Sequence, residues 1–457
     1  MMTGDMPSAD DAWLFGWDPM PGIVSVWADH TGGARVWQRT AAGVHCRVDR
    51  FRPWLFAAGL DDLRYLGAAL VEASAPHADR APVTYQTLDG PPDSLRFLLS
   101  ARDGRALREA ILRGARRRVG RSVAGLRDLP GAYYTVGPVE QYLMATGRVY
   151  FRGLAYDDLH RLQFDLETTA LSPRDGRIFL VAVRDSRGLE TLLDAPTADD
   201  EAALIADLCA LIAARDPDVI ENHNLFGFDL PFLEARAAAL GVPLRLGRAA
   251  DLPGLDRFDE PTGWGNGRRT RYSTAGRELI DTLPAVQRHQ FVDRSLPGSG
   301  LKAAARYFGV AAPARTYIPG ADIYMTYQRD PERVRRYAFD DVREVDGLSR
   351  RLMGAPFALA WRGWPHAATS ERLWRGPRWA SWSRCWCAPT GGLERLSHVR
   401  HRETPRSRHT RVGRLCSTPV AWRGAWSRRT SPRCTPRSSA PSASDPPRTR
   451  WVCSSRS

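Results

Sequence analysis

Cysteine is scarce in the first 360 residues of this 457-residue chain, where only Cys46 and Cys209 occur among the seven cysteines of the whole sequence. A disulfide framework is therefore excluded for that part, as is typical of a protein from a reducing compartment. No apolar run approaches the roughly 18 residues that a membrane-spanning helix needs, and the amino terminus has no basic region followed by an apolar stretch. We therefore expect a cytoplasmic protein without a membrane segment.

Lysine is almost absent, because Lys302 is the only lysine among 65 basic residues, and this indicates a GC-rich gene. The net charge of +14 would suggest a nucleic-acid partner, but its position decides its meaning. Residues 361–457 hold 20 arginines against four acids, whereas residues 1–360 hold 45 basic and 47 acidic residues, a net charge of −2. The excess of positive charge therefore gives no support for DNA binding by the first 360 residues.

The composition changes again near residue 360. Residues 361–457 contain nine of the fifteen tryptophans and five of the seven cysteines, without the period of a helix or a strand. We interpret residues 358–457 as a tail of low order, rich in Arg, Trp, Ser and Pro. Shifted codons of a GC-rich gene tend to yield these residues, so we hypothesise that the tail is an out-of-frame translation.

The first 155 residues are predicted to form a β-rich domain. Candidate strands lie at Ile23–Ala28 and at residues 34–38 and 53–57, with turn-forming residues between the first two. From residue 156 to residue 357, short apolar strands alternate with helices, which is typical of an α/β fold. The expected elements of this second domain are strands at residues 162–167, 177–185 and 218–221 and a helix at residues 199–215. A last helix should begin after Asp330, which can cap it, and run from Pro331 to about Leu352.

Several acidic side chains occur where such a fold could gather them. Asp165 and Glu167 stand two apart on a predicted strand, so they point to the same face, about 6–7 Å apart. Asp229 follows the next strand but one, and Tyr337 and Asp341 are four apart on one face of the last helix. Clustered carboxylates repel one another unless a cation neutralises them, and hard oxygen ligands suit Mg²⁺ or Mn²⁺. Two such ions about 4 Å apart can hydrolyse a phosphodiester without a covalent nucleophile.

At these residues the sequence resembles the DEDD exonucleases of the ribonuclease H-like fold, in their tyrosine-bearing subclass. The segment from Phe164 to Thr168 is similar to the first motif of this family. Asn224 together with Phe228 and Asp229 is similar to the second, and Tyr337 with Asp341 to the third. The fold implied by this resemblance is an α/β domain with a mixed sheet.

Three further segments resemble family B DNA polymerases: Phe51 to Phe56, Tyr150 to Leu154, and Gly298 to Ala305. The resemblance covers about residues 10–357 and implies the 3′→5′ proofreading exonuclease portion of a polymerase that acts in DNA replication or repair. It further implies that two Mg²⁺ ions, or Mn²⁺, are bound by Asp165, Glu167, Asp229 and Asp341, and that the hydroxyl of Tyr337 orients the attacking water. Asn224 and Phe228 would contact the terminal nucleotides of a single-stranded 3′ end of DNA, where stacking contributes ~1–3 kcal/mol per base.

Polymerase activity is not predicted for this chain, because neither the D-x-x-S-L-Y-P nor the D-T-D type of palm-domain motif occurs in the sequence. Two alternative functions stay open. One is a nucleic-acid-binding remnant of a polymerase with little activity, which the intact acidic motifs disfavour. The other is an independent DEDD nuclease acting on RNA, for which the amino-terminal β-rich domain would be an unusual companion.

Three residues or segments near the motifs have simpler interpretations. Asp340 is expected to be a solvated helix acid, because the four-residue step from Tyr337 selects Asp341. His223 is interpreted as a packing or hydrogen-bonding residue. The glycine-rich segment 263–267 has the composition of a hairpin turn, exposed or in contact with DNA.

Overall fold

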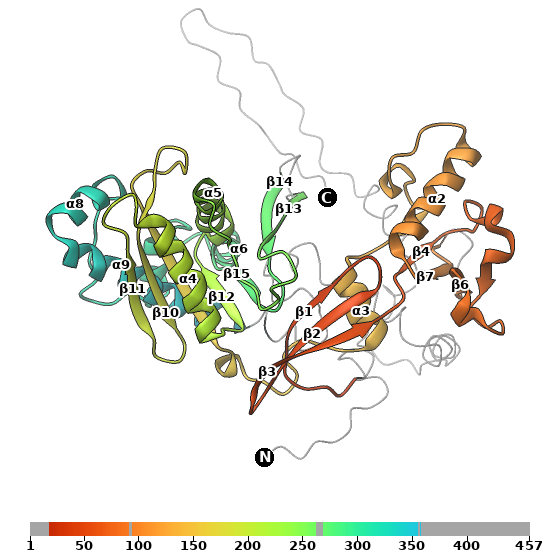
Figure 1. Ribbon diagram of the computed structural model, residues 1–457, viewed down its shortest axis with the longest axis horizontal. Coiled ribbons are helices and arrows are strands. Elements are labelled where there is room, and N and C mark those ends of the chain that lie inside the picture. The colour runs from red at the N-terminus through yellow and green to blue at the C-terminus, as the bar shows by residue number, and fades with distance from the viewer. Residues whose placement is uncertain (1–17, 91–93, 262–267, 355–356, 358–457) are drawn as a thin grey trace, which may run out of the picture. The chain divides into compact units, whose positions relative to one another are not determined.

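The computed structural model describes residues 18–90, 94–261, 268–354 and residue 357 (Figure 1). The described residues fall into two compact units, one with residues 18–54, 100–107 and 136–357 and one with residues 55–99 and 108–135. The tail predicted at residues 358–457 and the glycine-rich segment 263–267 lie outside the described residues. The domain boundaries drawn from the sequence at residues 155 and 357 stay a prediction.

The smaller unit is built on a five-stranded sheet with one long helix. The order of its strands is β5-β6-β7-β4-β8. Its elements are β4 (Trp54–Ala57), η1 (Arg64–Ala69), β5 (Leu70–Glu72), η2 (Ala78–Arg80), β6 (Val83–Thr87), β7 (Phe97–Ala101), α2 (Gly104–Val119), η3 (Leu126–Asp128) and β8 (Tyr133–Tyr134).

The larger unit begins with a three-stranded antiparallel sheet in the order β1-β2-β3. Its strands are β1 (Ile23–Ala28), β2 (Gly33–Thr40) and β3 (Gly43–Arg50). The turn between β1 and β2 is closed by Asp29, whose Oδ1 accepts hydrogen bonds from the backbone N–H groups of Thr31 and Gly33 at 2.7 and 3.0 Å. The β-rich character predicted for the amino-terminal residues is confirmed.

The rest of the larger unit is a five-stranded mixed sheet flanked by helices, as the α/β interpretation predicts. The order of the strands is β11-β10-β9-β12-β15. Strand β10 pairs antiparallel with β11 and with β9, whereas β12 pairs parallel with β9 and with β15. Its strands are β9 (Arg161–Thr168), β10 (Ile178–Asp185), β11 (Glu190–Asp194), β12 (Val219–Asn222) and β15 (Glu278–Asp281), and the hairpin β13 (Asp256–Pro261) and β14 (Arg268–Ser273) precedes the last of them.

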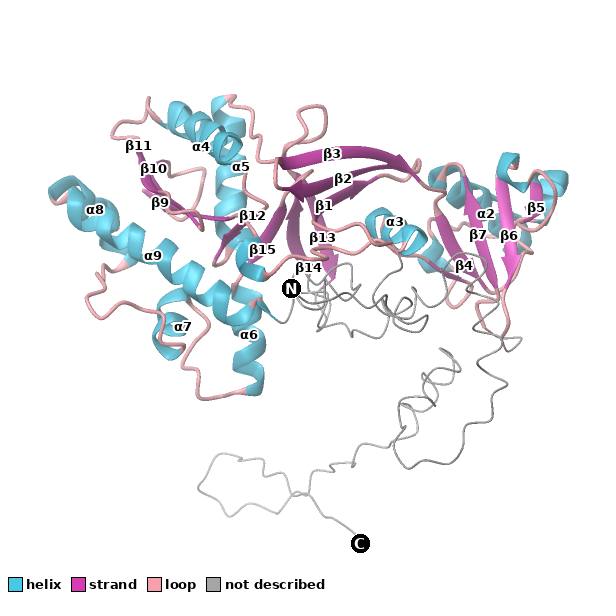
Figure 2. Ribbon diagram, turned by 90° about the horizontal axis from the view of Figure 1, so that it is seen from below, coloured by secondary structure: helices cyan, strands magenta, loops and turns pink. Residues whose placement is uncertain are grey.

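Helices cover both faces of this sheet, as Figure 2 shows, with α4 and α5 on one side and α9 on the other. The helical elements are α3 (Pro138–Thr146), η4 (Tyr156–Asp158), α4 (Glu201–Arg215), the π-helical turn η5 (Leu225–Asp229), α5 (Leu230–Leu240), α6 (Leu283–Val292), α7 (Leu301–Tyr307), η6 (Gly320–Asp322), α8 (Ile323–Arg329) and α9 (Pro331–Leu352). No helix among the described residues is long and apolar enough to cross a membrane.

The side chains of β9 alternate between the two faces of the sheet, so different residues face the helices on each side. Leu162, Phe164 and Leu166 belong to the apolar core under α4 and α5. Because successive side chains of a strand point to opposite faces, Asp165 and Glu167 point to the face that α9 covers. A single strand therefore supplies three apolar side chains to one core and, from its other face, two acids.

Helix α9 begins where the sequence predicts. The Asp330 side chain accepts a hydrogen bond from the N–H of Arg333 at 3.1 Å, and Pro331 takes the first helical position, where its missing N–H costs nothing. Val334, Ala338 and Val342 are fully buried against the sheet. This packing orients the helix so that Tyr337 and Asp341 lie over β9.

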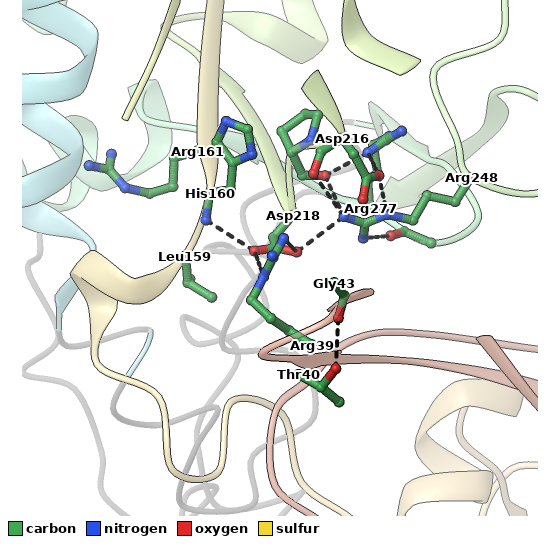
Figure 3. A network of polar contacts seen from close by, with 12 residues as sticks. Arg39, Thr40, Gly43, Leu159, His160, Arg161, Asp216, Asp218, Arg248 and Arg277 are labelled. Atoms are coloured by element: carbon green, nitrogen blue, oxygen red, sulfur yellow. Dashed lines mark hydrogen bonds and ion pairs between the residues drawn. The ribbon is translucent and has the colours of Figure 1, made fainter. Parts of the chain in front are cut away.

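The amino-terminal sheet and the mixed sheet share a core inside the larger unit. Its buried members include Ile23 of β1, Val36 and Trp37 of β2, Tyr142 of α3, Val219 of β12 and Ile280 of β15. The segment that precedes β9 also contributes to this core. A network of ion pairs accompanies this core, at the start of β12 (Figure 3).

Asp218 is the centre of that network. Its two oxygens accept from Nε and Nη2 of Arg39, both at 2.7 Å, and from the backbone N–H of His160 at 3.0 Å. Arg248 donates to Asp218 at 3.1 Å and, through Nε, to Asp216 at 2.6 Å. The side chain of Asp218 is completely buried. Strand β2 is thereby fastened to the beginning of β12 and β9.

Candidate active site

Three of the predicted acids come together where β9 faces α9. Ligand oxygens of Asp165, Glu167 and Asp341 all lie within 4.8 Å of one another. Glu167 and Asp341 are each 5% exposed, so solvent does little to screen their charges. The alternation of side chains along the strand and the four-residue step along the helix thus bring these acids together, as the sequence predicts.

The fourth acid, Asp229, is 2% exposed and lies next to this group without being one of its three members. Its charge interacts with those of Asp165 and Glu167. Asn222 connects the two, because its Nδ2 donates to Oδ1 of Asp165 at 3.1 Å and its side chain also forms a hydrogen bond with Asp229. Asp229 therefore belongs to the same electrostatic unit, and its role as a metal ligand stays a prediction.

The turn η5 sets the position of Asp229. Asn224 precedes it with a φ of +71°, a left-handed conformation that asparagine tolerates better than most residues. Asp281, at the end of β15, accepts from the backbone N–H groups of Asn224 and Phe226 at 2.9 and 3.1 Å. A buried carboxylate thus anchors the start of the bend from which Asp229 emerges.

The two residues predicted to contact DNA lie on the same turn. The Asn224 side chain sits over Gly227, where an added Cβ would lie 2.3 Å from Oδ1 of Asn224, so only glycine leaves the amide in place. The ring of Phe228 is partly buried, and its centroid lies 5.6 Å from that of Phe232. Contact of Asn224 and Phe228 with a terminal nucleotide stays a prediction.

Burial makes the charged forms of these acids costly. Burial and the charge of Asp341 raise the pKa of Asp165 to about 7. Burial and Asp165 raise the pKa of Glu167 and of Asp229 well above their usual values. Burial also raises the pKa of Asp341, although the neighbouring cations Lys302 and Arg315 lower it again in part. A cluster of carboxylates with pKa values shifted in this direction is stabilised by a bound cation.

The residues present fit a divalent metal ion. All the candidate ligands are hard carboxylate oxygens, which Mg²⁺ and Mn²⁺ prefer. Oε1 of Glu167 is buried and has no hydrogen-bond partner in the described part of the chain, so this acceptor still lacks a counterpart. Asp165, Glu167 and Asp341 would hold the ion, with Asp229 beside them.

Two cations from a helix start and a loop complete the site, and sequence reasoning did not assign them to it. Nζ of Lys302 donates to the hydroxyl of Tyr337 and lies 3.8 Å from Oδ2 of Asp341. Arg315, 1% exposed in its side chain, pairs with Asp341 and, at 2.6 Å, with Oε1 of Glu344. The unique lysine of an arginine-rich chain was a signal for Lys302, whereas Arg315 lies in a loop without any pattern.

Tyr337 remains a neutral phenol in this setting. The residue is 3% exposed, and burial, with the charges of Asp341 and Glu167, raises the pKa of its hydroxyl far above the usual value. The hydroxyl therefore cannot act as a base near neutral pH. It can still bind and orient a water molecule by hydrogen bonding.

Two interpretations of neighbouring residues have different outcomes. Asp340 is not a solvated helix acid: its side chain is only 13% exposed and accepts a hydrogen bond from the N–H of Thr316 at 2.9 Å. That expectation was wrong because the chain before η6 folds back over α9 and supplies a backbone donor. His223 is a hydrogen-bonding residue, as interpreted, with partners on both ring nitrogens.

Comparisons with known proteins agree with this geometry. Residues 159–299 match the exonuclease domain of DNA polymerase family B. This segment is therefore similar to the exonuclease domain of that family. It contains β9, β12 and η5, and thus Asp165, Glu167 and Asp229, while Tyr337 and Asp341 lie beyond it in the chain. The resemblance deduced from the motifs is confirmed.

Relatives and solved structures extend the likeness beyond the exonuclease domain. The chain is 26% identical over 245 residues to a DNA polymerase of Pyrococcus glycovorans and 28% identical over 203 residues to DNA polymerase 2 of Aeropyrum pernix. These alignments cover 49% and 43% of this chain, but only 30% and 23% of the two polymerases. A family B DNA polymerase from Pyrobaculum calidifontis shares the fold, with a TM-score of 0.55 and 22% identity over 85% of this chain and 52% of that one.

Proposed function

We propose that this chain is a 3′→5′ DNA exonuclease of the proofreading type, which removes nucleotides one at a time from a single-stranded 3′ end and depends on divalent metal ions. The observation that carries the proposal is the convergence of Asp165, Glu167 and Asp341 within 4.8 Å, inside and next to a family B exonuclease domain. DNA synthesis is not part of the proposal, because neither palm-domain motif occurs in the sequence.

The reaction is the hydrolysis of the last phosphodiester bond. A water oxygen forms a bond to the phosphorus, the bond from phosphorus to the 3′ oxygen of the preceding nucleotide breaks, and that oxygen takes up a proton. A nucleoside monophosphate leaves. A bound pair of divalent ions would supply an activated water and neutralise the charge on the leaving oxygen.

The chain's own residues would bind and orient the reactants. Tyr337, held as a neutral phenol, would fix the attacking water by a hydrogen bond, and orientation of this kind lowers the barrier by removing freedom of motion. Lys302 lies beside that hydroxyl and can face the negative charge of the phosphate. Asn224 and Phe228, on the bend before Asp229, would contact the terminal nucleotides.

The test is a degradation assay with three substrates labelled at the 3′ end: single-stranded DNA, duplex DNA and RNA. We expect release of labelled mononucleotide from single-stranded DNA in Mg²⁺ or Mn²⁺, slower release from duplex DNA, and none in EDTA. A parallel substrate labelled at the 5′ end should shorten step by step, which establishes the direction. Asp165→Ala serves as the control for a contaminating nuclease.

Other outcomes would identify the alternative functions. Faster degradation of RNA than of DNA would make the chain an RNA nuclease of the same fold. DNA binding without hydrolysis in either metal would make it a binding remnant. Both results would overturn the proposal.

A further inference from the structure

His223 connects two parts of the site that are distant in sequence. It comes directly after β12 and lies next to Asn224. Its Nδ1 is 2.9 Å from Oγ1 of Thr282, the residue after β15, and its Nε2 is 2.9 Å from the carbonyl oxygen of Ser299, in the loop before α7. The imidazole therefore joins the end of the sheet to the start of a helix.

The partners define the state of the ring. A carbonyl oxygen can only accept, so Nε2 of His223 carries the hydrogen and donates it to Ser299. Burial lowers the pKa of His223 despite the nearby charge of Asp281, which favours the neutral ring. Nδ1 then accepts from the hydroxyl of Thr282. Both ring nitrogens are satisfied, and the ring is fixed in one tautomer and one orientation.

The loop that His223 contacts is anchored at its start by Leu296, which is 2% exposed, and has two glycines next to the carbonyl that accepts from His223. Gly298 and Gly300 flank Ser299, and glycine leaves a backbone free to adopt many conformations. Gly300 caps α7, and its carbonyl accepts the first helical hydrogen bond from Ala304 at 3.0 Å. A single bond from a buried side chain to the Ser299 carbonyl is thus well placed to set where α7 begins.

The start of α7 determines where the only lysine side chain of the protein points. Lys302 is the second residue of the helix. Its Nζ lies 4.4 Å from the ring centroid of Tyr337, donates to the hydroxyl of that residue, and lies 3.8 Å from Asp341. Because the side chain is 38% exposed, packing alone does not hold it there.

We propose that His223 is a positioning residue: by donating to the Ser299 carbonyl it fixes the first turn of α7 and so keeps the Lys302 ammonium group at Tyr337 and Asp341. The placement of Lys302 is a structural statement that stands by itself. Its consequence for catalysis rests on the proposed exonuclease function, in which Tyr337 orients the water.

The lysine itself offers a direct readout. Protein labelled with ¹³Cε or ¹⁵Nζ lysine gives one side-chain signal, because Lys302 is the only lysine in the sequence. We expect His223→Ala to move this signal toward that of a solvent-exposed lysine. His289→Ala is the matched control, since His289 contacts Tyr307 and Phe308 at the other end of α7. An unchanged signal in His223→Ala would overturn the proposal.

Two conservative variants separate positioning from a general loss of packing. Glutamine can place an N–H near the position of Nε2, whereas asparagine reaches only the position of Nδ1. We therefore expect His223→Gln to restore the wild-type lysine signal and His223→Asn to give the signal of the alanine variant. If asparagine restored the signal and glutamine did not, the contact with Thr282 would be the important one, and the proposal would be wrong. This pair of variants also decides the matter if His223→Ala fails to fold.

Activity measurements test the second half of the proposal. His223→Ala should lower kcat about tenfold with little change in KM, since the substrate-binding residues keep their places. Combined with Lys302→Ala, it should lower kcat no further than Lys302→Ala alone, because both changes remove the same interaction. Independent effects that multiply in the double variant would overturn the route through Lys302. If the wild-type protein degrades no DNA, the exonuclease proposal fails, while the lysine signal still tests the placement.

Discussion

The two ends of the paired strands β9 and β12 contain acids with different partners. At the end where both strands begin, Asp216 and Asp218 are matched by arginines from β2 and from the residues that precede and follow β13 and β14. At the other end, Asp165, Glu167 and Asp229 have no arginine or lysine within ion-pair distance among the described residues. Burial alone therefore does not distinguish the carboxylates of the candidate site; their gathering at one place, with less cationic charge than carboxylate charge around them, does.

Asp341 combines both characters. It belongs to the acidic group with Asp165 and Glu167, yet Arg315 and Lys302 partly balance its charge. The comparison therefore predicts three classes of response to removal of a carboxylate: loss of activity alone, loss of stability alone, and loss of both.

The largest expected effect is the loss of activity in Asp165→Ala and Asp229→Ala. Each variant removes a predicted metal ligand and also a source of repulsion between carboxylates, so hydrolysis of single-stranded DNA should fall to about a few per cent or less. The free energy of unfolding in EDTA, measured with urea, should not fall. The exposed acid Asp199, in the segment before α4, provides the control variant. Substantial residual activity in Mg²⁺ would place the site elsewhere.

Asp218→Ala should give the reverse result. It leaves Arg39 and Arg248 without their buried partner, a change that typically costs about 3–5 kcal/mol, so we expect a loss of stability of that size. Urea denaturation measures this loss, with Asp199→Ala again as the reference. Activity per folded molecule should remain close to that of the wild type. If Asp218→Ala were as stable as the wild type, the ion pairs of Asp218 would not stabilise the contact of β2 with β12 and β9.

Asp341→Ala should lose both properties. Arg315 would keep Glu344 as its only carboxylate, so the protein should be destabilised, but by less than in Asp218→Ala because one ion pair remains. Hydrolysis should fall as in Asp165→Ala. If Asp341→Ala were as stable as the wild type, Asp341 would affect activity alone, as is expected of Asp165.

Tyr337→Phe should have a smaller effect, on turnover alone. The ring still packs against α8 and the sheet, and only the hydroxyl that we propose to orient water is lost. We expect kcat to fall by about 10- to 100-fold at saturating DNA, with the Mg²⁺ concentration for half-maximal activity unchanged. Unchanged turnover would remove Tyr337 from the mechanism.

The smallest effect concerns Glu278, a partly buried acid outside both clusters. Glu278 accepts from the hydroxyl of Ser25 at 3.0 Å, and burial raises its pKa to about 7 from an unfolded value near 4.5. A raised pKa favours the protonated folded form, so its stabilising contribution is fully present below about pH 4.5 and is lost as pH rises through about 7. Thermal unfolding at about pH 5.5 and about pH 8 should show a larger loss of stability for the wild type than for Glu278→Gln, which keeps the contributions of the other acids with raised pKa values. Equal pH dependence of the two proteins would contradict this assignment.

The sequence predicts the fold and the acids for a physical reason. Local rules determine β9 and α9: alternation puts Asp165 and Glu167 on one face, and a capped helix fixes the face of Tyr337 and Asp341. The ends of elements were less exact, since β2 extends to Gly33 and Thr40, beyond the predicted residues 34–38.

What the sequence did not predict depends on loops. Arg315 reaches Asp341 from the irregular segment between α7 and η6, and the backbone of Thr316 in that segment removes Asp340 from solvent. Asn222 ends a strand in a position like many others, and nothing local marks it as the bridge between Asp165 and Asp229. Such contacts arise from long-range packing, for which composition and period contain no signal.

The π-helical turn η5 gives the second motif a fixed length. Its wide turn, closed by the N–H of Leu230 on the carbonyl of Leu225, holds one residue more than an ordinary helical turn. Removing one residue there would rotate the downstream helix α5 by about 100° relative to the bend, and Asp229 would point away from Asp165. The number of residues from Asn224 to Asp229 therefore determines the direction in which the Asp229 side chain points. Insertions and deletions should be tolerated in the hairpin of β13 and β14, but the count of residues inside this turn should not vary in any chain that keeps the site.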